Sequence, residues 1–179
     1  TSVLLMIAER DIGQTGATYW WSTSGEGIPP VSRAQQRLEE LFTDKGFAPV
    51  NPIAARGSVS LQGVGGSPEP AVAPACQLAA QLDAAFVVLG TAVLAPSRNP
   101  QAPAAEDIQC SLNAQVIEVK TQAVLVQAAT YALGRQTSPR GALQEAIDKA
   151  CSQLADQIAD RFFQQQRNSR AYVFRLLFT

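Results

Sequence analysis

Two carboxylates stand at the end of the first apolar segment of the chain. Residues 3–8 are apolar, and Glu9, Arg10 and Asp11 follow them directly. A pair of carboxylates beside a cleft can supply acid/base chemistry of the glycosidase kind, and open sheets commonly bind ligands at strand ends. The simpler interpretation is that Arg10 forms an ion pair with Glu9 or Asp11 at a strand terminus. We favour the ion pair, so these residues give no support for an enzyme.

A glycine-containing loop follows, over residues 11–30. The backbone N–H groups of such a loop can hold a phosphate where the loop leads straight into a helix. Gly13 and Gly16 fit neither G-x-x-x-x-G-K-[ST] nor G-x-G-x-x-G, and roughly 15 residues separate Gly16 from the expected helix. We therefore expect no nucleotide and no other cofactor here.

The same loop holds Tyr19, Trp20 and Trp21, which include both tryptophans of the chain. One alternative is that they fold back as a lid on the core. The other is that they stay partly exposed as a docking patch, since Trp and Tyr are common anchors of interfaces. Tyr19, Trp20 and Trp21 are therefore the candidate partner-binding residues, and the exposure of the two indoles separates the alternatives.

The chain has no histidine, which removes the usual general base near neutral pH, the Ser-His-Asp and Cys-His systems and every metal site that contains histidine. The cysteines Cys76, Cys110 and Cys151 lie far apart without C-x-x-C spacing. They are either buried as small apolar residues or include one disulfide with one thiol left over, and the pairing stays open. We expect no catalytic residue and no metal.

The charges are nearly balanced, with 14 basic and 15 acidic residues and a net charge of -1. No run of basic residues is evident, so neither nucleic acid nor an anionic membrane surface is indicated. No apolar run reaches the roughly 18 residues that a transmembrane helix needs. Because the sequence begins with Thr1 and stops within an apolar segment, we expect it to be a piece of a longer chain, with any signal peptide or lipid-anchor cysteine upstream.

Hydrophobic periodicity predicts an α/β (α+β) domain over residues 1–179, with a mixed sheet of about five to six strands and a long C-terminal helix. Ser32 is expected to cap the first helix, with Gln35 as its reciprocal partner, and Ser138 to cap the last, which runs to Phe162. The expected strands are 2–8, 47–50, 85–94, 108–116, 124–133 and 171–178. The remaining expected elements are a helix over 76–82 and two long loops over 51–70 and 96–107, the first with one helical turn near residues 53–55.

The segment 108–116 alternates most cleanly between apolar and polar side chains. Ile108, Cys110 and Leu112 share one side of the strand, and Gln109 and Ser111 share the other. This strand is expected to have a dry face and an amide-lined face, and to pair with 124–133 as an antiparallel hairpin.

Several segments together resemble one superfamily of bacterial envelope proteins. They are residues 3–9, 46–51, 84–92 and 112–121. The superfamily contains the curli-secretion lipoprotein CsgG, the penicillin-binding-protein activator LpoB, the TolB N-terminal domain and the flagellar protein FlgT. The FlgT middle domain and LpoB-like members are the most similar, although Gln122 stands where the family usually has Gly, and Glu118 where Asp is common.

The resemblance implies a non-enzymatic, periplasmic and outer-membrane-associated interaction or assembly domain of a lipoprotein. Its partner would be an envelope protein of a secretion, flagellar or cell-wall machine, or a second copy of the chain. The alternative is a domain that binds carbohydrate or peptidoglycan fragments through Tyr19, Trp20, Trp21 and the nearby carboxylates. No catalytic residue is carried over, because the family has no shared one.

Overall fold

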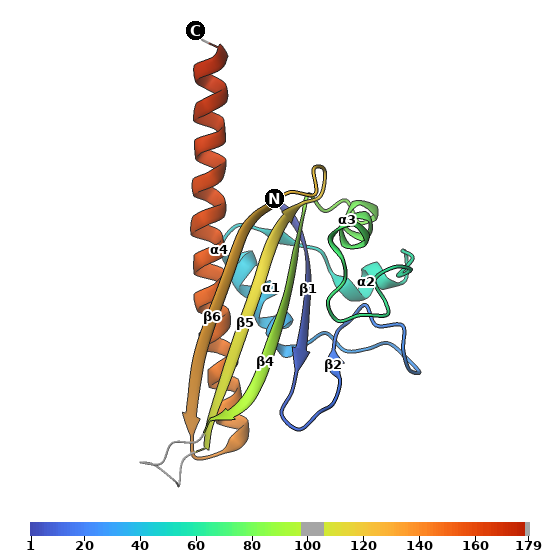
Figure 1. The fold of residues 1–179 in the computed structure, drawn as a ribbon, viewed down its shortest axis with the longest axis vertical. Coiled ribbons are helices and arrows are strands. Elements are labelled where there is room, and N and C mark those ends of the chain that lie inside the picture. Colours follow the sequence, from blue (N-terminus) through green and yellow to red (C-terminus); the bar gives the residue numbers. More distant parts are fainter. Residues whose placement is uncertain (98–105, 178–179) are drawn as a thin grey trace.

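The computed structural model describes residues 1–97 and 106–177. A six-stranded sheet with the order β2-β1-β4-β5-β6 forms its centre, and β3 pairs with β1 (Figure 1). The strands are β1 (Ser2–Arg10), β2 (Ala17–Thr18), β3 (Ala48–Pro49), β4 (Phe86–Ser97), β5 (Glu106–Glu118) and β6 (Val124–Gln136). The helices are α1 (Arg33–Asp44), α2 (Pro52–Arg56), α3 (Val72–Gln81) and α4 (Pro139–Leu177). The expected fold class is confirmed.

The sheet is mixed. β1 is parallel to β3 and β4. It is antiparallel to β2, and β4 with β5 and β5 with β6 are also antiparallel. Seven consecutive residues of β1 are buried, which explains why this strand is apolar without alternation. The short β2 was not expected from the sequence.

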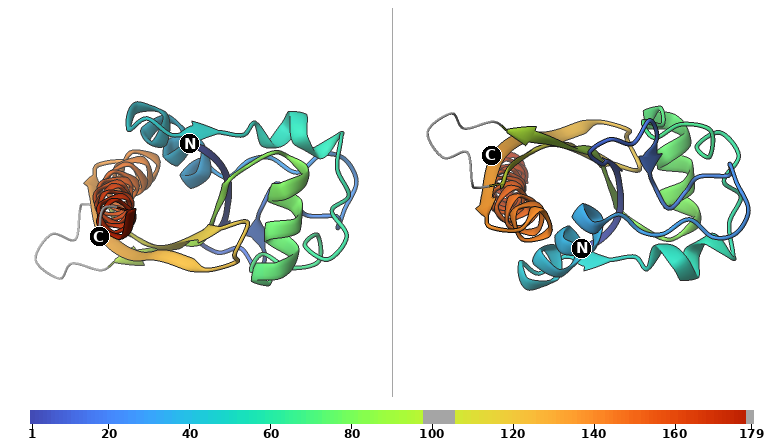
Figure 2. Two further views of the ribbon diagram at one scale, coloured as in Figure 1. Left: turned by 90° about the horizontal axis from the view of Figure 1, so that it is seen from above. Right: turned by 90° about the horizontal axis from the view of Figure 1, so that it is seen from below.

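Helices cover the sheet unevenly. α1 and α4 lie on one side of it, and α3 lies on the other side, near β4 and the end of β5 (Figure 2). Two apolar clusters follow from this arrangement. Alternate residues Val3, Leu5 and Ile7 of β1 join the cluster beneath α1 and α4, whereas Leu4 and Met6 join the cluster beneath α3. Among the described residues, α3 reaches the end of β5, where Ile117 is buried, and most of the outer side of β5 and β6 stays uncovered by a helix.

The first turn of α1 confirms half of the expected cap. Ser32 Oγ accepts a hydrogen bond from the Gln35 N–H at 3.2 Å. The Gln35 side chain does not reciprocate, because its Oε1 accepts from the Ile7 N–H of β1 at 3.0 Å and its Nε2 donates to Glu39. Gln35 thus joins the helix to the central strand.

The hairpin of β5 and β6 is also confirmed, with its turn over residues 119–123. Gln122 has φ +59°, a left-handed conformation that favours glycine. Gln122 is one of the two positions where this chain departs from the family that it resembles. Its backbone has the conformation in which the glycine usual in that family is favoured.

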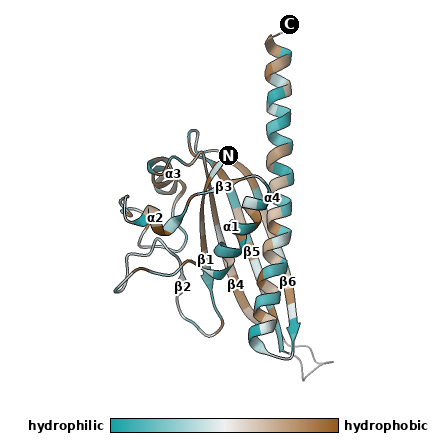
Figure 3. Cartoon of the chain, turned by 180° about the vertical axis from the view of Figure 1, so that it is seen from behind, coloured by the Kyte–Doolittle hydropathy of each residue, from teal (hydrophilic) through white to brown (hydrophobic). Residues whose placement is uncertain are grey.

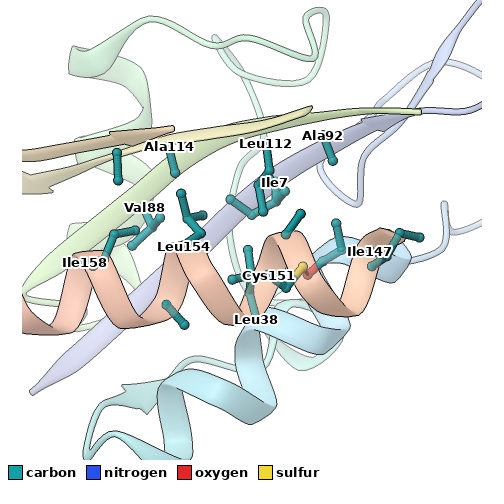
Figure 4. Packing of buried hydrophobic residues seen from close by; sticks show 14 of the residues in the cluster. Ile7, Leu38, Val88, Ala92, Leu112, Ala114, Ile147, Cys151, Leu154 and Ile158 are labelled. Atoms are coloured by element: carbon teal, nitrogen blue, oxygen red, sulfur yellow. Dashed lines mark hydrogen bonds between the residues drawn. The ribbon is translucent and has the colours of Figure 1, made fainter. Parts of the chain in front are cut away.

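The C-terminal segment differs from the expectation. The predicted final strand over 171–178 is wrong, since α4 continues without a break from Pro139 to Leu177. Ile147, Leu154 and Ile158 face the sheet, as predicted. With Cys151, which was not part of the predicted stripe, they pack against side chains of β1, β4 and β5 (Figure 4). Beyond Phe163 the helix leaves the sheet and extends past the rest of the chain (Figure 1). No proline or glycine follows Gly141, so nothing in the sequence stops the helix where the packing ends.

Three smaller expectations are confirmed with shifted bounds. The helical turn near residues 53–55 is α2, with Asn51 as its cap, and the helix expected over 76–82 begins earlier, at Val72. The strand expected over 47–50 is the short β3. The loop expected over 96–107 falls mostly outside the described residues, with β4 reaching Ser97 and β5 beginning at Glu106.

Candidate functional site

An uncovered sheet surface is the most distinctive part of the molecule. β4, β5 and β6 lie in front of α1 and α4 in Figure 1, and none of the helices of the described residues lies in front of these three strands. We call this surface the open face. It is formed by the outward residues of the three strands, namely Val93, Gln109, Ser111, Asn113, Gln115, Gln127, Ala129, Tyr131 and Leu133, together with Thr91, which points the same way but is buried.

Strand register places these residues in cross-strand rows. Val93, Ser111 and Tyr131 form one row, and Thr91, Asn113 and Ala129 form the next. The open face therefore contains the amide-lined side that the alternation in 108–116 predicted.

Apolar groups lie among these amides. Tyr131 is 53% exposed, and Val93 and Leu133 are also exposed. The Tyr131 hydroxyl donates to Gln109 Oε1 at 2.9 Å, which holds the ring across β5. Beyond this row, Arg135 of β6 forms a bidentate ion pair with the buried Asp107 at 2.8 and 2.9 Å. The result is a polar surface with an aromatic centre, a composition common at protein interfaces.

The end of the open face near Gln115 is hollowed, with a volume of about 710 Å³. It is lined by Asn113 and Gln115 of β5, by Gln127 of β6, by residues 68–70 and by Arg161 of α4. Arg161 Nη1 donates to the Gln127 carbonyl at 2.6 Å across the edge of the sheet. The hollow offers amides, one exposed carboxylate, Glu69, and one guanidinium, which can hydrogen-bond a polar ligand.

The carboxylates at the end of β1 form ion pairs with an arginine of α1. Glu9 is buried, and its partner is Arg33, the first residue of α1, not Arg10 as expected. Arg33 Nη2 lies 2.6 Å from Glu9 Oε1 and 2.8 Å from Asp11 Oδ2, while Glu9 Oε2 accepts from the Ala34 N–H at 3.0 Å. A carboxylate at a helix N-terminus stabilises the helix. Because Glu9 lies at the end of β1 and Asp11 follows that strand, whereas Arg33 and Ala34 belong to α1, this cluster also joins the strand to the helix.

Both indoles of the 11–30 loop are buried. Trp20 is 1% exposed and Trp21 is fully buried. Their Nε1 atoms donate to the carbonyls of Leu5 at 3.0 Å and Ser67 at 2.9 Å, and Tyr19 stacks against Trp21. This geometry supports the lid alternative, and it leaves no indole face for a sugar. Partner binding at Tyr19, Trp20 and Trp21 stays a prediction.

The three cysteines are free thiols, and all are buried. Burial raises the pKa of Cys110 to about 12 and raises the pKa values of Cys76 and Cys151 as well. The Cys151 thiol faces the Ala34 carbonyl of α1. The arrangement matches the first alternative, in which the cysteines act as small apolar residues. Because a raised pKa keeps a thiol protonated, these cysteines are also poor nucleophiles.

Within the described ranges, no group of three or more His, Cys, Asp or Glu side chains is placed to hold a metal ion. No helix among the described residues is long and apolar enough to span a bilayer. The open face is therefore the surface that we take as the candidate site.

The fold is therefore a mixed sheet with α1 and α4 on one side and α3 over part of the other side, and a solved structure shares it. No protein-family model matches the chain, and no curated protein matches it in sequence. Among solved structures, the lipoprotein GNA1162 from Neisseria meningitidis is similar over 89% of this chain and 98% of its own, with 10% identity and a TM-score of 0.51. The LpoB C-terminal domain from Salmonella enterica is similar over 73% of this chain and 81% of its own, with 16% identity and a TM-score of 0.42.

The likeness to GNA1162 shows a shared fold. The finer placement near CsgG, TolB, FlgT or LpoB stays a prediction.

Proposed function

We propose that this chain is a non-enzymatic interaction or assembly domain of a periplasmic, outer-membrane-associated lipoprotein. Its partner is an envelope protein of a secretion, flagellar or cell-wall machine. The observation that supports this most is the open face, where three long strands of a folded sheet present Tyr131, Val93 and Leu133 to solvent. The fold shared with a bacterial lipoprotein supports the location.

The open face fits a protein partner for a physical reason. Tyr131 has its hydroxyl fixed by Gln109, so its ring is held in place before any partner arrives. A rigid aromatic group surrounded by amides loses little side-chain entropy on binding, and such groups are frequent hot spots. The side chains that surround it are neutral.

Affinity capture from envelope extracts tests this proposal. The bait proteins are the unmodified chain, Tyr131→Glu, and the control Gln153→Glu, whose residue is exposed on α4 away from the open face. We expect the unmodified chain and the control to retain the same partner and Tyr131→Glu to lose it, because a desolvated carboxylate opposes binding. Equal capture by all three proteins would contradict the proposal, as would turnover of a small substrate by the purified chain.

A second candidate function is binding of carbohydrate or peptidoglycan fragments. The hollow beside Gln115 favours it, since Asn113, Gln115 and Gln127 provide amide donors and acceptors within about 710 Å³. The site would then be the hollow and not Tyr19, Trp20 and Trp21, as the sequence first indicated. Calorimetric titration with muropeptides tests it: binding that Asn113→Ala with Gln115→Ala removes supports this function, and absence of heat for every fragment excludes it.

A further inference from the structure

β6 is the last strand of the sheet, so one of its two edges has no neighbouring strand. Two basic side chains of α4 bond to carbonyl oxygens on that edge. Lys149 Nζ donates to the Leu133 carbonyl at 3.3 Å. Arg161 Nη1 donates to the Gln127 carbonyl at 2.6 Å. The outer edge of β6 is therefore capped at two separate points.

The main-chain groups between these two points follow the alternation of a strand. In a strand, the N–H and C=O groups of every second residue point to the same edge. Those of Ala129 and Tyr131 therefore point outward, as the carbonyls of Gln127 and Leu133 do. No hydrogen bond from the described residues reaches these outward groups, and both residues are exposed. The edge thus has an open stretch between two capped carbonyls.

The open stretch is long enough for a short strand. At roughly 3.4 Å per residue, Gln127 and Leu133 lie about 20 Å apart, which leaves room for about five residues of extended chain. An antiparallel strand placed there would exchange hydrogen bonds with the N–H and C=O groups of Ala129 and Tyr131. Unpaired groups at a sheet edge bind extended peptides in this way.

A second copy of the chain does not fit this edge. α4 lies directly beneath β6 (Figure 3), where Thr130 Oγ1 donates to the Ala150 carbonyl at 3.0 Å and a Cβ at Gly134 would meet helix backbone. Antiparallel pairing of two β6 edges would put both α4 helices on the same side, beneath neighbouring strands. Neighbouring strands lie about 4.8 Å apart, whereas packed helix axes need about 8–10 Å. The edge therefore fits an extended segment with no helix beneath it.

The charges at the two ends of the open stretch differ. Lys149 forms an ion pair with Glu145 of the same helix. Within the described ranges, no carboxylate pairs with Arg161, whose printed partner is the Gln127 carbonyl. A segment antiparallel to β6 would have its C-terminal end at Gln127, beside Arg161. An acidic side chain at that end would complement the guanidinium.

We propose that the outer edge of β6 binds an extended segment of another protein, which joins the sheet as an antiparallel strand and carries an acidic residue at its C-terminal end. The main chain of the segment pairs with Ala129 and Tyr131, and its carboxylate pairs with Arg161. This inference goes beyond the proposed function, because it concerns main-chain groups of the edge and holds whether or not the side chains of the open face bind a protein.

Titration with short peptides tests this proposal, with the amide NMR signals of the isotope-labelled chain as the readout. The probe is acetyl-Thr-Val-Thr-Val-Glu-amide, whose central threonine faces Ala129 when the glutamate lies beside Arg161. We expect the amide signals of Ala129 and Tyr131 to shift. Methylation of the central threonine nitrogen should weaken binding at least about ten-fold, because the facing carbonyl loses its donor. Methylation of the second valine nitrogen, which points away from β6, is the matched control and should have little effect.

Variants of the chain test the same contacts from the other side. Ala129→Pro removes an outward N–H, which an edge strand tolerates, and should weaken peptide binding at least about ten-fold. Ala129→Val keeps the N–H and should bind normally. Replacement of the peptide's glutamate by lysine should weaken binding about five-fold, the upper range for an exposed ion pair, and Arg161→Gln should remove that difference. Circular dichroism confirms that each variant is folded.

Absence of binding at millimolar peptide, equal weakening by the two methylated peptides, or signal shifts confined to residues outside β6 would overturn the proposal. So would a dimer in sedimentation velocity that Ala129→Pro converts to a monomer, since a second copy would then occupy the edge. If Ala129→Pro does not fold, the two methylated peptides give the same test on the unmodified chain.

Discussion

Gly134 allows α4 to lie directly on β6. A Cβ atom at this position would lie 1.8 Å from the Ala142 carbonyl oxygen and 2.7 Å from the Ala146 nitrogen, both backbone atoms of α4. Because helix backbone cannot move aside as a flexible side chain can, a single added methyl group separates the two elements.

We therefore expect Gly134→Ala to lower the free energy of unfolding by about 3 kcal/mol, the upper end of overpacking effects. Urea denaturation measures it. Gly16→Ala is the matched control, because a Cβ there meets nothing within 4 Å, and its effect should stay within about 0.5 kcal/mol. Equal stability of the two variants would show that α4 does not lie on β6 as described.

Ionisation of Glu145 makes the stability of the fold at the first turns of α4 depend on pH. Its pKa is lowered to about 2 by hydrogen bonds from Lys149, from Gln136 and from the Arg135 N–H. The unfolded carboxyl titrates near 4.5, so the unfolded chain binds more protons between these values. This stabilisation is complete above about pH 4.5 and is lost as the pH falls toward 2.

The expected result is that Glu145→Gln is less stable than the unmodified chain at pH 7 and that this difference shrinks between pH 4.5 and 2.5. Urea midpoints at several pH values measure it. A difference that stays constant over that range would mean that the Glu145 carboxylate has no stabilising partners.

At the scale of elements, α4 consists of two parts with different roles. The part up to Phe163 packs on the sheet, and residues 164–177 are almost entirely exposed. Removal of residues 168–179 should therefore change the melting temperature by less than about 3 °C, the shift expected for 1 kcal/mol or less in a chain of this size. Phe162→Ala, which removes a buried ring, should cost about 3–5 kcal/mol and serves as the contrast. A truncated chain that unfolds like Phe162→Ala would contradict this division.

The same elements show which features of a sequence determine structure. The alternation over 108–116 predicted β5 and its two faces, because one buried side imposes a period of two. The segment 171–178, by contrast, was wrongly predicted to be a strand, because Tyr, Val and Phe favour strands on average. An established helix extends at little cost, and without proline or glycine its continuation outweighs that preference.

At the scale of the molecule, the open face could be predicted only in part. Its amides were visible in the alternation of β5, and Tyr131 follows the same period in β6. The hollow was not predictable, because Arg161 and residues 68–70 come from segments that only the tertiary fold brings to the sheet. For the same reason the sequence could not show that Arg33, and not Arg10, pairs with Glu9.

The fold therefore separates three parts of the chain. Tyr19, Trp20 and Trp21 are buried beside β1, the open face presents polar and aromatic groups on β4 to β6, and the end of α4 presents arginine and apolar groups at a distance. The central claim is that the open face binds a protein partner.

Site-specific photo-crosslinking in intact cells tests that claim most directly. A photoreactive residue is placed at Ser111, Asn113 or Tyr131 on the open face, and at Gln153 or Asp160 on the exposed side of α4 as controls. We predict one adduct of common mass from the three open-face positions and none from the two controls. Adducts of equal yield from both sets, or adducts from the α4 positions alone, would contradict the claim.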